Sequence, residues 1–222
     1  MHDFHYISKH DPKVQEAFRD LEVLIHELQN AVRDEFTFSY RPVGSYSRNM
    51  ITFDTKSNIG FDFDINIEVN DECDEYSAKD IKAILINGLN KIAPKHGFDF
   101  PENSTRVITI KVKDLRHSNI IYSCDFAIVN NYEDDDGNEC QQYIRFNKNN
   151  GGYSWCEQPN GYYMLPEKYQ WIIENSDQGF LNELRELYIK KKNLNDDPNV
   201  HSRTIFANAV HEVCQKEGFY DE

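Results

Sequence analysis

Two aspartates separated by a single residue, Asp62 and Asp64, are the feature of this sequence with the clearest chemical meaning. They lie in an apolar run, FDFDINIEV at 61–69, which predicts a β-strand. Side chains two residues apart on a strand point to the same face, so both carboxylates should project side by side. Paired carboxylates repel each other and are costly to desolvate unless a cation or a proton shares the site. Oxygen ligands without nearby imidazole or thiol groups suit Mg²⁺ or Mn²⁺ rather than zinc.

A third carboxylate, Asp125, lies in another predicted strand, IIYSCDFAIV at 120–129. Aspartate is depleted in strands and is rarely buried without a partner. If the two strands are neighbours, Asp62, Asp64 and Asp125 can converge on a pair of metal ions. Simpler alternatives stay open at this point: the first two aspartates could line a solvated strand face, and Asp125 could be satisfied by backbone N–H groups.

A Gly-Ser pair, Gly44 and Ser45, precedes the Asp-x-Asp strand. Glycine allows the backbone to approach a phosphate closely, and the serine hydroxyl and following amides can donate hydrogen bonds to phosphate oxygens. A helix that begins within 45–49 would add favourable partial charge at its N-terminus. Alone, such a pair is more often an ordinary turn, so its meaning depends on its position relative to the aspartates.

The Gly-Ser turn, the Asp-x-Asp strand and the later single Asp together resemble the nucleotidyltransferases of the DNA polymerase β superfamily. The long helix predicted before Gly44 and the helices after Asp125 are most similar to the branch that contains oligoadenylate synthase, cyclic GMP–AMP synthase and their bacterial relatives. The motifs cover roughly residues 11–129. Sixteen residues separate Ser45 from Asp62, which is longer than is usual in the family, so a small insertion is expected there. Asp54 lies in this insertion but has no aspartate partner two residues away.

The resemblance implies an α+β fold: a polymerase β-like catalytic lobe with a mixed sheet, residues 1–150, and a helical lobe, residues 151–222, packed against it. It also implies transfer of a nucleoside monophosphate from an NTP, ATP or GTP, to an acceptor with release of pyrophosphate. Two divalent ions, Mg²⁺ or Mn²⁺, stabilise the attacking and leaving oxygens in such reactions. Asp62 and Asp64 would bridge both ions, and Asp125 would hold the ion beside the nucleophile.

In the family, a basic residue on a C-terminal helix contacts the triphosphate, and a serine opens the final core helix. Arg185, or alternatively Lys190, and Ser202 occupy comparable places here and are the predicted nucleotide contacts of this half. The sequence departs from the family pattern in two ways: no Trp follows the basic residue, and Arg203 stands where an aromatic residue is often found.

The charge of the chain restricts its partners. A net charge of −14 argues against nonspecific duplex binding, which depends on Lys and Arg neutralising phosphates. The one dense basic cluster, 190–192, ends a predicted helix, where cations complement exposed carbonyl groups. The acceptor stays open among a nucleotide, a protein hydroxyl, a small molecule and an RNA end. A catalytically silent NTP-binding or protein-interaction module on the same fold is the alternative function.

Localisation is predicted to be cytoplasmic. No apolar run approaches the roughly 20 residues that a membrane helix needs, and the first residues, MHDFHYISKHDP, lack the zones of a signal peptide. They are expected to form a frayed terminus that includes His2 and His5. Five scattered cysteines without a CxxC pair indicate reduced thiols.

Hydrophobic periodicity and capping residues predict the elements around these motifs. Asp11-Pro12 should start a long amphipathic helix, and Ser77 with Asp80 should form a capping box. The acidic run at 133–138 should be a hairpin turn rather than a calcium loop, and 149–164 should be irregular. The predicted helices are 12–34, a helix from about 78 to Pro94, 166–175, 178–192 and 201–216, and the predicted strands are 36–43, the Asp-x-Asp strand, 106–113, 119–129 and 141–146.

Overall fold

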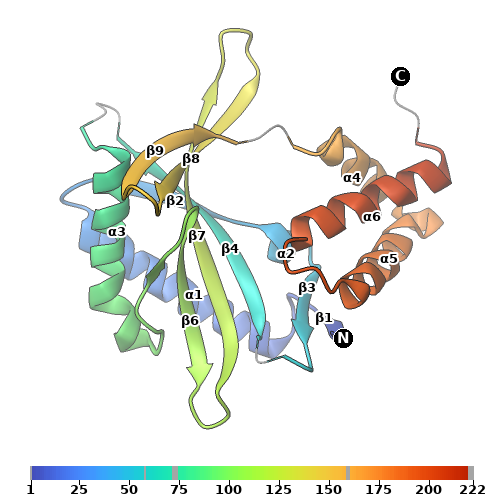
Figure 1. Ribbon diagram of the computed structural model, residues 1–222, viewed down its shortest axis with the longest axis horizontal. Helices are drawn as coiled ribbons and strands as arrows, with labels where there is room; N and C mark the ends of the chain where they lie inside the picture. Colours follow the sequence, from blue (N-terminus) through green and yellow to red (C-terminus); the bar gives the residue numbers. More distant parts are fainter. Residues whose placement is uncertain (1, 58, 72–74, 159–160, 220–222) are drawn as a thin grey trace. The chain divides into compact units, whose positions relative to one another are not determined.

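The computed structural model describes residues 2–57, 59–71, 75–158 and 161–219. It has the predicted α+β character, and it divides into two compact units (Figure 1). Residues 7–53 and 58–158 form the sheet unit, and residues 1–6, 54–57 and 159–222 form the helical unit. The chain therefore passes between the units near its N-terminus and around residue 54 as well as after the sheet. The functional division into a catalytic lobe and a helical lobe stays a prediction.

The sheet unit contains one mixed sheet with the strand order β2-β4-β7-β6-β5, and β8 pairs with both β7 and β9. Strands β4 and β7 are parallel, whereas β2 pairs antiparallel with β4 and β6 pairs antiparallel with β7. The elements of this unit, with β3 at its border, are α1 (Pro12–Val32), β2 (Thr37–Val43), α2 (Gly44–Ser47), β3 (Ile51–Asp54), β4 (Phe61–Asn70), α3 (Ala78–Ile92), η1 (Ala93–His96), β5 (Glu102–Asn103), β6 (Val107–Asp114), β7 (Asn119–Glu133), β8 (Glu139–Asn147) and β9 (Gly152–Glu157).

The two helix starts that the sequence predicts are confirmed. The side chain of Asp11 accepts a hydrogen bond from the amide of Lys13 at the start of α1. Ser77 and Asp80 form the reciprocal capping box of α3, in which each side chain contacts the backbone N–H of the other residue. These caps satisfy amide donors that have no partner within the helix, and they fix where each helix begins.

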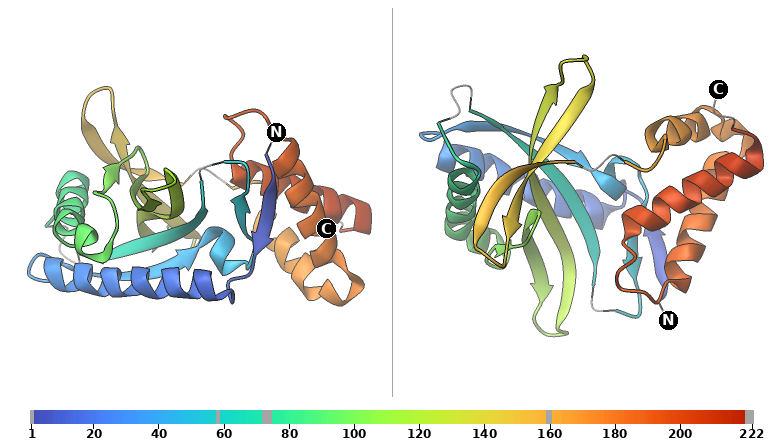
Figure 2. Two further views of the ribbon diagram at one scale, coloured as in Figure 1. Left: turned by 90° about the horizontal axis from the view of Figure 1, so that it is seen from below. Right: turned by 45° about the horizontal axis from the view of Figure 1, so that its top comes forward.

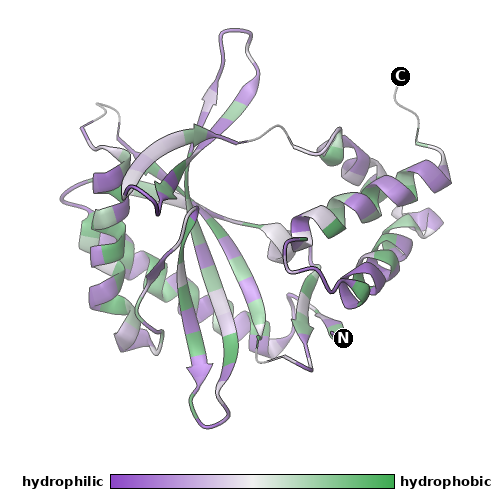
Figure 3. Cartoon of the chain, in the orientation of Figure 1, coloured by the Kyte–Doolittle hydropathy of each residue, from purple (hydrophilic) through white to green (hydrophobic). Residues whose placement is uncertain are grey.

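The core lies between the sheet and its two long helices, α1 and α3. Along β4, Phe63, Ile65 and Ile67 are buried in the same cluster as the apolar faces of both helices. The residues between them are only half-buried and face the other side of the sheet. Figure 3 shows this alternation as bands of opposite hydropathy along the central strands. One face of the sheet therefore holds the unit together, and the other face is available for polar side chains.

Within the described residues, the helical unit consists mainly of the helices α4, α5 and α6, which Figure 2 shows in two further views. Its core includes Leu184, Tyr188, Phe206 and Val210, all nearly inaccessible to solvent. None of the helices in the described part of the chain combines the length and apolar character that a membrane crossing requires. The elements of this unit are β1 (Phe4–Ile7, with Ile7 at its border), α4 (Leu165–Glu174), η2 (Ser176–Gln178), α5 (Phe180–Leu194) and α6 (Ser202–Glu217).

Two sequence predictions are wrong. Residues 149–164 are not wholly irregular, because β9 pairs with β8 between 152 and 157; the alternation of Tyr153 and Trp155 with smaller residues is a strand pattern that the flanking glycines obscured. The N-terminus is not frayed from residue 2 onward, since β1 forms and Nδ1 of His2 lies 2.7 Å from Oδ2 of Asp54. The predicted hairpin turn is confirmed: Asp134 accepts hydrogen bonds from the amides of Asp136 and Asn138.

The cysteines that the structure describes are free thiols, as predicted. Cys124 and Cys214 are buried, and Cys140 and Cys156 are half-buried. Cys73 lies outside the described residues.

Candidate functional site

The two aspartates of β4 point away from the core. Asp62 and Asp64 alternate with the buried Phe61, Phe63 and Ile65, so they share the polar face of the sheet. Strand β7 runs parallel beside β4, and Asp125 lies directly opposite Asp64 in the register. The sequence placed these carboxylates on neighbouring strands, and that expectation is confirmed.

The three carboxylates converge. One oxygen from each of Asp62, Asp64 and Asp125 can be chosen so that all three atoms lie within 4.8 Å of one another. The three residues are half-buried. A separation of this size allows three carboxylate oxygens to share divalent cations, and carboxylate oxygens are the ligands that Mg²⁺ and Mn²⁺ prefer.

The surroundings of Asp64 and Asp125 disfavour the ionised forms of these two carboxyl groups on balance. Burial and the neighbouring Asp125 carboxylate raise the pKa of Asp64 to about 6, although the Arg48 guanidinium opposes this shift. Burial also raises the pKa of Asp125, while a hydrogen bond from Thr109 and the charge of Lys111 act in the opposite direction. Raised carboxyl pKa values mean that the ionised forms are disfavoured in the metal-free protein. A bound cation would reverse this preference.

Gly44 contacts the cluster directly. The residue before it, Val43, is the register partner of Asp64 in β2, and the short helix α2 begins at Gly44 itself. A Cβ atom added to Gly44 would lie 2.0 Å from Oδ2 of Asp64, and the Gly44 φ of +66° is a conformation that residues with side chains rarely adopt. Only glycine fits here. The sequence assigned this glycine to phosphate contact; the structure adds close packing against an acidic side chain.

Ser45 follows Gly44 within α2, and this helix begins at Gly44, one residue before the range 45–49 in which a helix start was considered. Its carbonyl oxygen accepts a hydrogen bond from the amide of Met50, which closes the turn that leads into β3. The Ser47 hydroxyl donates to the carbonyl oxygen of Gly44 over 3.0 Å. The turn is therefore held by its own hydrogen bonds beside Asp64, and a phosphate-binding role for Ser45 stays a prediction.

Two hydroxyl groups that the sequence analysis missed contact the carboxylates. The Ser123 hydroxyl donates to Oδ1 of Asp62 over 2.7 Å, and the Thr109 hydroxyl donates to Oδ1 of Asp125 over 2.5 Å. A partial signal existed for Ser123, because it lies two residues before Asp125 and so shares its face. Thr109 could be found only once β6 was known to pair with β7. Arg48, whose charge acts on Asp64, was missed as well.

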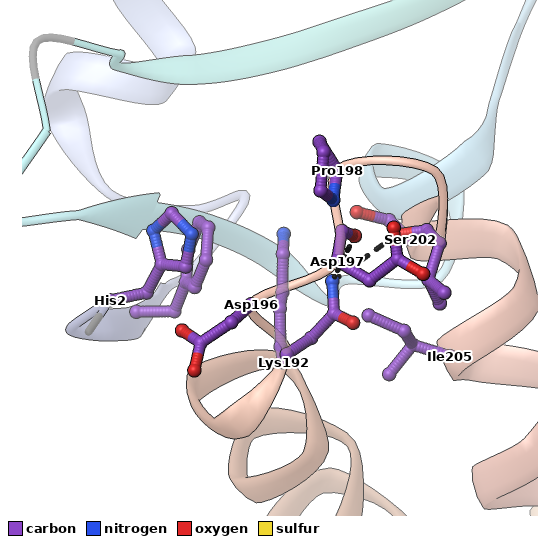
Figure 4. A pocket seen from close by; sticks show the side chains of 10 residues that line it. His2, Lys192, Asp196, Asp197, Pro198, Ser202 and Ile205 are labelled. Atoms are coloured by element: carbon purple, nitrogen blue, oxygen red, sulfur yellow. Dashed lines mark hydrogen bonds between the residues drawn. The ribbon is translucent and has the colours of Figure 1, made fainter.

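The other two predicted nucleotide contacts belong to the helical unit. Arg185 lies in α5, where its carbonyl oxygen accepts a hydrogen bond from the Tyr6 hydroxyl over 2.8 Å. Ser202 is the first residue of α6 and lines a hollow of about 210 Å³ together with Lys192, Asp196 and Ile205, among others (Figure 4). The Asn195 side chain shapes this hollow by donating to the carbonyl oxygens of Asp197 and Val200. Nucleotide contact by Arg185 or Ser202 stays a prediction.

Comparison with known proteins identifies the fold. No protein-family model matches the sequence, and no curated protein matches it. Among solved structures, the CdnE cyclic dinucleotide synthase of Elizabethkingia meningoseptica with GTP and Apcpp aligns with a TM-score of 0.53 and 16% identity, over 95% of this chain and 79% of that chain. The GTP-bound form of Vibrio cholerae DncV aligns with a TM-score of 0.56 and 15% identity, over 96% of this chain and 53% of that chain.

A further structure of Vibrio cholerae DncV, described as a cyclic AMP-GMP synthase in complex with the linear intermediate 5′ pppA(3′,5′)pG, aligns with a TM-score of 0.56 and 14% identity, over 92% of this chain and 54% of that chain. This chain therefore has the fold of these bacterial cyclic dinucleotide synthases, and the predicted resemblance is confirmed at the level of fold alone. The chain spans about four fifths of the CdnE chain but only about half of the DncV chains.

Proposed function

We propose that this chain is a metal-dependent nucleotidyltransferase that transfers a nucleoside monophosphate from ATP or GTP to an acceptor hydroxyl and releases pyrophosphate. The observation that carries the proposal is the convergence of Asp62, Asp64 and Asp125 within 4.8 Å on the polar face of the sheet. Its support from similar proteins is that structures with the same fold are described as dinucleotide synthases with bound GTP or a linear dinucleotide.

The donor atoms of the site fit a hard divalent cation. All three candidate ligands are carboxylates, the combination that favours Mg²⁺ or Mn²⁺ over zinc. Burial raises the pKa of Asp64 and of Asp125, and the neighbouring Asp125 carboxylate raises that of Asp64 further, so a cation has a large electrostatic advantage at this position. Asp62 and Asp64 would hold both ions, and Asp125 would complete the coordination of one. Two bound divalent ions supply stabilisation of the attacking and leaving oxygens in an in-line displacement.

The protein's own residues have separate parts in the transfer. A bond forms between the acceptor oxygen and the α-phosphorus of the NTP, the bond from that phosphorus to the oxygen bridging to the β-phosphate breaks, and pyrophosphate leaves. Asp125, the carboxylate on the strand beside β4, is assigned the acceptor side, where it would help to accept the hydroxyl proton. We assign hydrogen bonding to the triphosphate to Ser45 and the amides that follow it. We assign further contacts with the nucleotide to Arg185 and Ser202.

A second nucleotide is the acceptor that the similar structures favour. CdnE and DncV are described as synthases of cyclic dinucleotides, and one DncV structure contains a linear dinucleotide intermediate. Because this chain covers only part of the DncV length, the proposal extends to the first nucleotidyl transfer and includes no commitment to cyclisation.

Incubation with single labelled NTPs and with pairs of them, in Mg²⁺ or Mn²⁺, tests the reaction. We expect pyrophosphate and a new nucleotide product that separates from the NTPs, and we expect neither with the Asp64→Asn variant. If the parent binds NTP tightly but releases no pyrophosphate with any acceptor mixture, the binding-module alternative is favoured. If the parent binds no NTP, the nucleotidyltransferase proposal is wrong.

The role of Ser45 is tested by NTP binding. Loss of one charge-assisted hydrogen bond should weaken binding by roughly 1–3 kcal/mol in Ser45→Ala. Ser47→Ala is the matched control, because Ser47 lies in the same short helix but donates to the carbonyl oxygen of Gly44. Equal NTP affinities of the two variants, measured by calorimetry, would contradict the assignment of Ser45 to the triphosphate.

A further inference from the structure

Two hydroxyl groups contact the carboxylate cluster, each from the register position opposite an aspartate, one across a parallel strand pair and one across an antiparallel pair. Ser123 on β7 is the register partner of Asp62 on β4, and its hydroxyl donates to Oδ1 of that aspartate. Thr109 on β6 is the register partner of Asp125 on β7, and its hydroxyl donates to Oδ1 of that aspartate. In each pair, the carboxylate on one strand is held by a hydroxyl directly opposite on the next strand of the order β4-β7-β6.

Asp64 is oriented differently. Its register partners are Asp125 on one side and Val43 on the other, so neither neighbouring position supplies a hydroxyl. Its Oδ2 instead packs against the backbone of Gly44, too closely for a Cβ atom. The site thus contains two carboxylates fixed by hydrogen bonds and one fixed by packing.

The terminal torsion of an aspartate side chain is broad and roughly two-fold, so a carboxylate without a partner samples several orientations. A hydroxyl that donates to one carboxylate oxygen selects one of these orientations. Partners of this kind around metal ligands typically change metal affinity by 10–100-fold when they are removed.

We propose that Ser123 and Thr109 are positioning residues of the metal site: each donates to Oδ1 of its aspartate, Asp62 or Asp125, and so fixes the orientation in which that carboxylate binds a divalent cation. The proposal rests on the proposed function, because it assumes that these carboxylates bind metal. A purely structural role would instead mean that the two hydroxyls only satisfy partly buried carboxylates and have no influence on metal affinity.

Mn²⁺ binding, followed by electron paramagnetic resonance of the free ion, distinguishes these roles without reference to activity. We expect Thr109→Val and Ser123→Ala each to raise the dissociation constant for Mn²⁺ by about 10-fold. Thr109→Ser retains the hydroxyl and should stay within about threefold of the parent protein. Thr37→Val is the matched control: Thr37 is on the same sheet, but it pairs with Asn70 at the far end of β4, and its removal should leave Mn²⁺ binding unchanged.

The melting temperature in EDTA, measured on the same variants, completes the test. If Thr109→Val and Ser123→Ala are less stable in EDTA but bind Mn²⁺ as the parent does, the hydroxyls are structural and the positioning proposal is overturned. If Thr37→Val weakens Mn²⁺ binding as much as Thr109→Val does, the effect is not specific to the site, and the positioning proposal is overturned as well. Failure of the proposed function has a different signature: Asp64→Asn would then bind Mn²⁺ as well as the parent, or the parent would bind none, and both proposals would fall together.

Discussion

Two acidic positions in this protein, the buried Asp54 and the half-buried Asp64, respond to burial in opposite ways. Asp54, in the helical unit, is only 5% exposed, and the fold supplies it with donors: Nδ1 of His2 lies 2.7 Å from Oδ2, and the amides of Asp3 and Lys56 donate to Oδ1. Burial alone would raise the pKa of Asp54, but the hydrogen bonds from His2 and from these amides outweigh it and hold that pKa well below its usual range.

Asp64, in the sheet unit, lies opposite another carboxylate instead of a donor, and its pKa is raised to about 6 by burial and by Asp125. The comparison separates two uses of a carboxylate that is withdrawn from solvent. Asp54 is stabilised as an anion from within the fold and connects chain segments about fifty residues apart. Asp64 is kept in an environment that disfavours its charge, an arrangement that is typical of functional sites and that a cation can relieve.

The largest expected difference between the two positions is in activity. Asp125→Asn, a change in the cluster of Asp64, should lower pyrophosphate release by about 1,000-fold or more, because the ion beside the nucleophile loses its dedicated ligand. NTP binding should change little, since Asp62 and Asp64 remain. Asp54→Asn is the matched substitution outside the cluster and should retain pyrophosphate release. Comparable losses in both variants, measured by a pyrophosphate assay on folded protein, would erase the distinction between the sites.

The next difference is in the response to metal. A cation that binds only the folded protein should stabilise it by about 2.7 kcal/mol at a concentration 100 times its dissociation constant. Mn²⁺ should therefore raise the melting temperature of the parent and of Asp54→Asn, but not that of the Asp62→Asn/Asp64→Asn double variant. Thermal unfolding with and without Mn²⁺ measures this. A double variant that responds as the parent does would place the metal site elsewhere, for example in the acidic 133–136 turn.

In the absence of metal, the same substitution should have opposite effects on stability at the two positions. Asp54→Asn replaces charge-assisted hydrogen bonds by weaker neutral ones and should cost about 2 kcal/mol of unfolding free energy. Asp64→Asn removes a disfavoured charge and relieves its repulsion with Asp125, so it should leave stability unchanged or increase it by about 1 kcal/mol. Urea unfolding in EDTA near neutral pH gives both values. A loss of stability in Asp64→Asn as large as in Asp54→Asn would show that Asp64 is also satisfied by the fold.

The sequence predicts those features of Asp54 and Asp64 that depend on neighbouring residues, but not those that depend on residues far away in the chain. The shared face of Asp62 and Asp64 follows from strand periodicity alone, and the lack of an aspartate partner two residues from Asp54 correctly set it apart from the Asp-x-Asp pair. The contacts of Asp54 with His2 and of Asp125 with Thr109 could not be predicted, because they join residues 52 and 16 positions apart through strand pairing. The tight fit of Gly44 against Asp64 likewise depends on the register between β2 and β4.

The errors in the fold have the same origin. Strand β9 is short and starts among glycines, and it is stabilised by its pairing with β8, so its own residues carry only a weak strand signal. Strand β1 has only four residues, FHYI, so its own sequence likewise carries only a weak strand signal. Helices α1 and α3 were predicted well, because their amphipathic patterns and their capping residues can be recognised within a single stretch of sequence.

The smallest expected effect is in the pH dependence of stability. A carboxyl group whose folded-state pKa is raised above its unfolded value of 3.8 contributes stability below about pH 4, and this contribution is lost as pH rises through the folded pKa, which is about 6 for Asp64. Asp54, whose folded pKa is lowered, has the opposite sign: its contribution is complete above about pH 4 and is lost only in more acidic solution.

From about pH 5 to about pH 7, Asp64 should therefore lower the unfolding free energy of the metal-free protein by about 1 kcal/mol, and Asp54 should leave it unchanged. Urea unfolding in EDTA across this range should show that fall in the parent and in Asp54→Asn, and a smaller fall in Asp64→Asn. Because the other titrating groups are common to all three proteins, identical pH profiles for the parent and Asp64→Asn would mean that the charge of Asp64 is compensated within the fold, as that of Asp54 is.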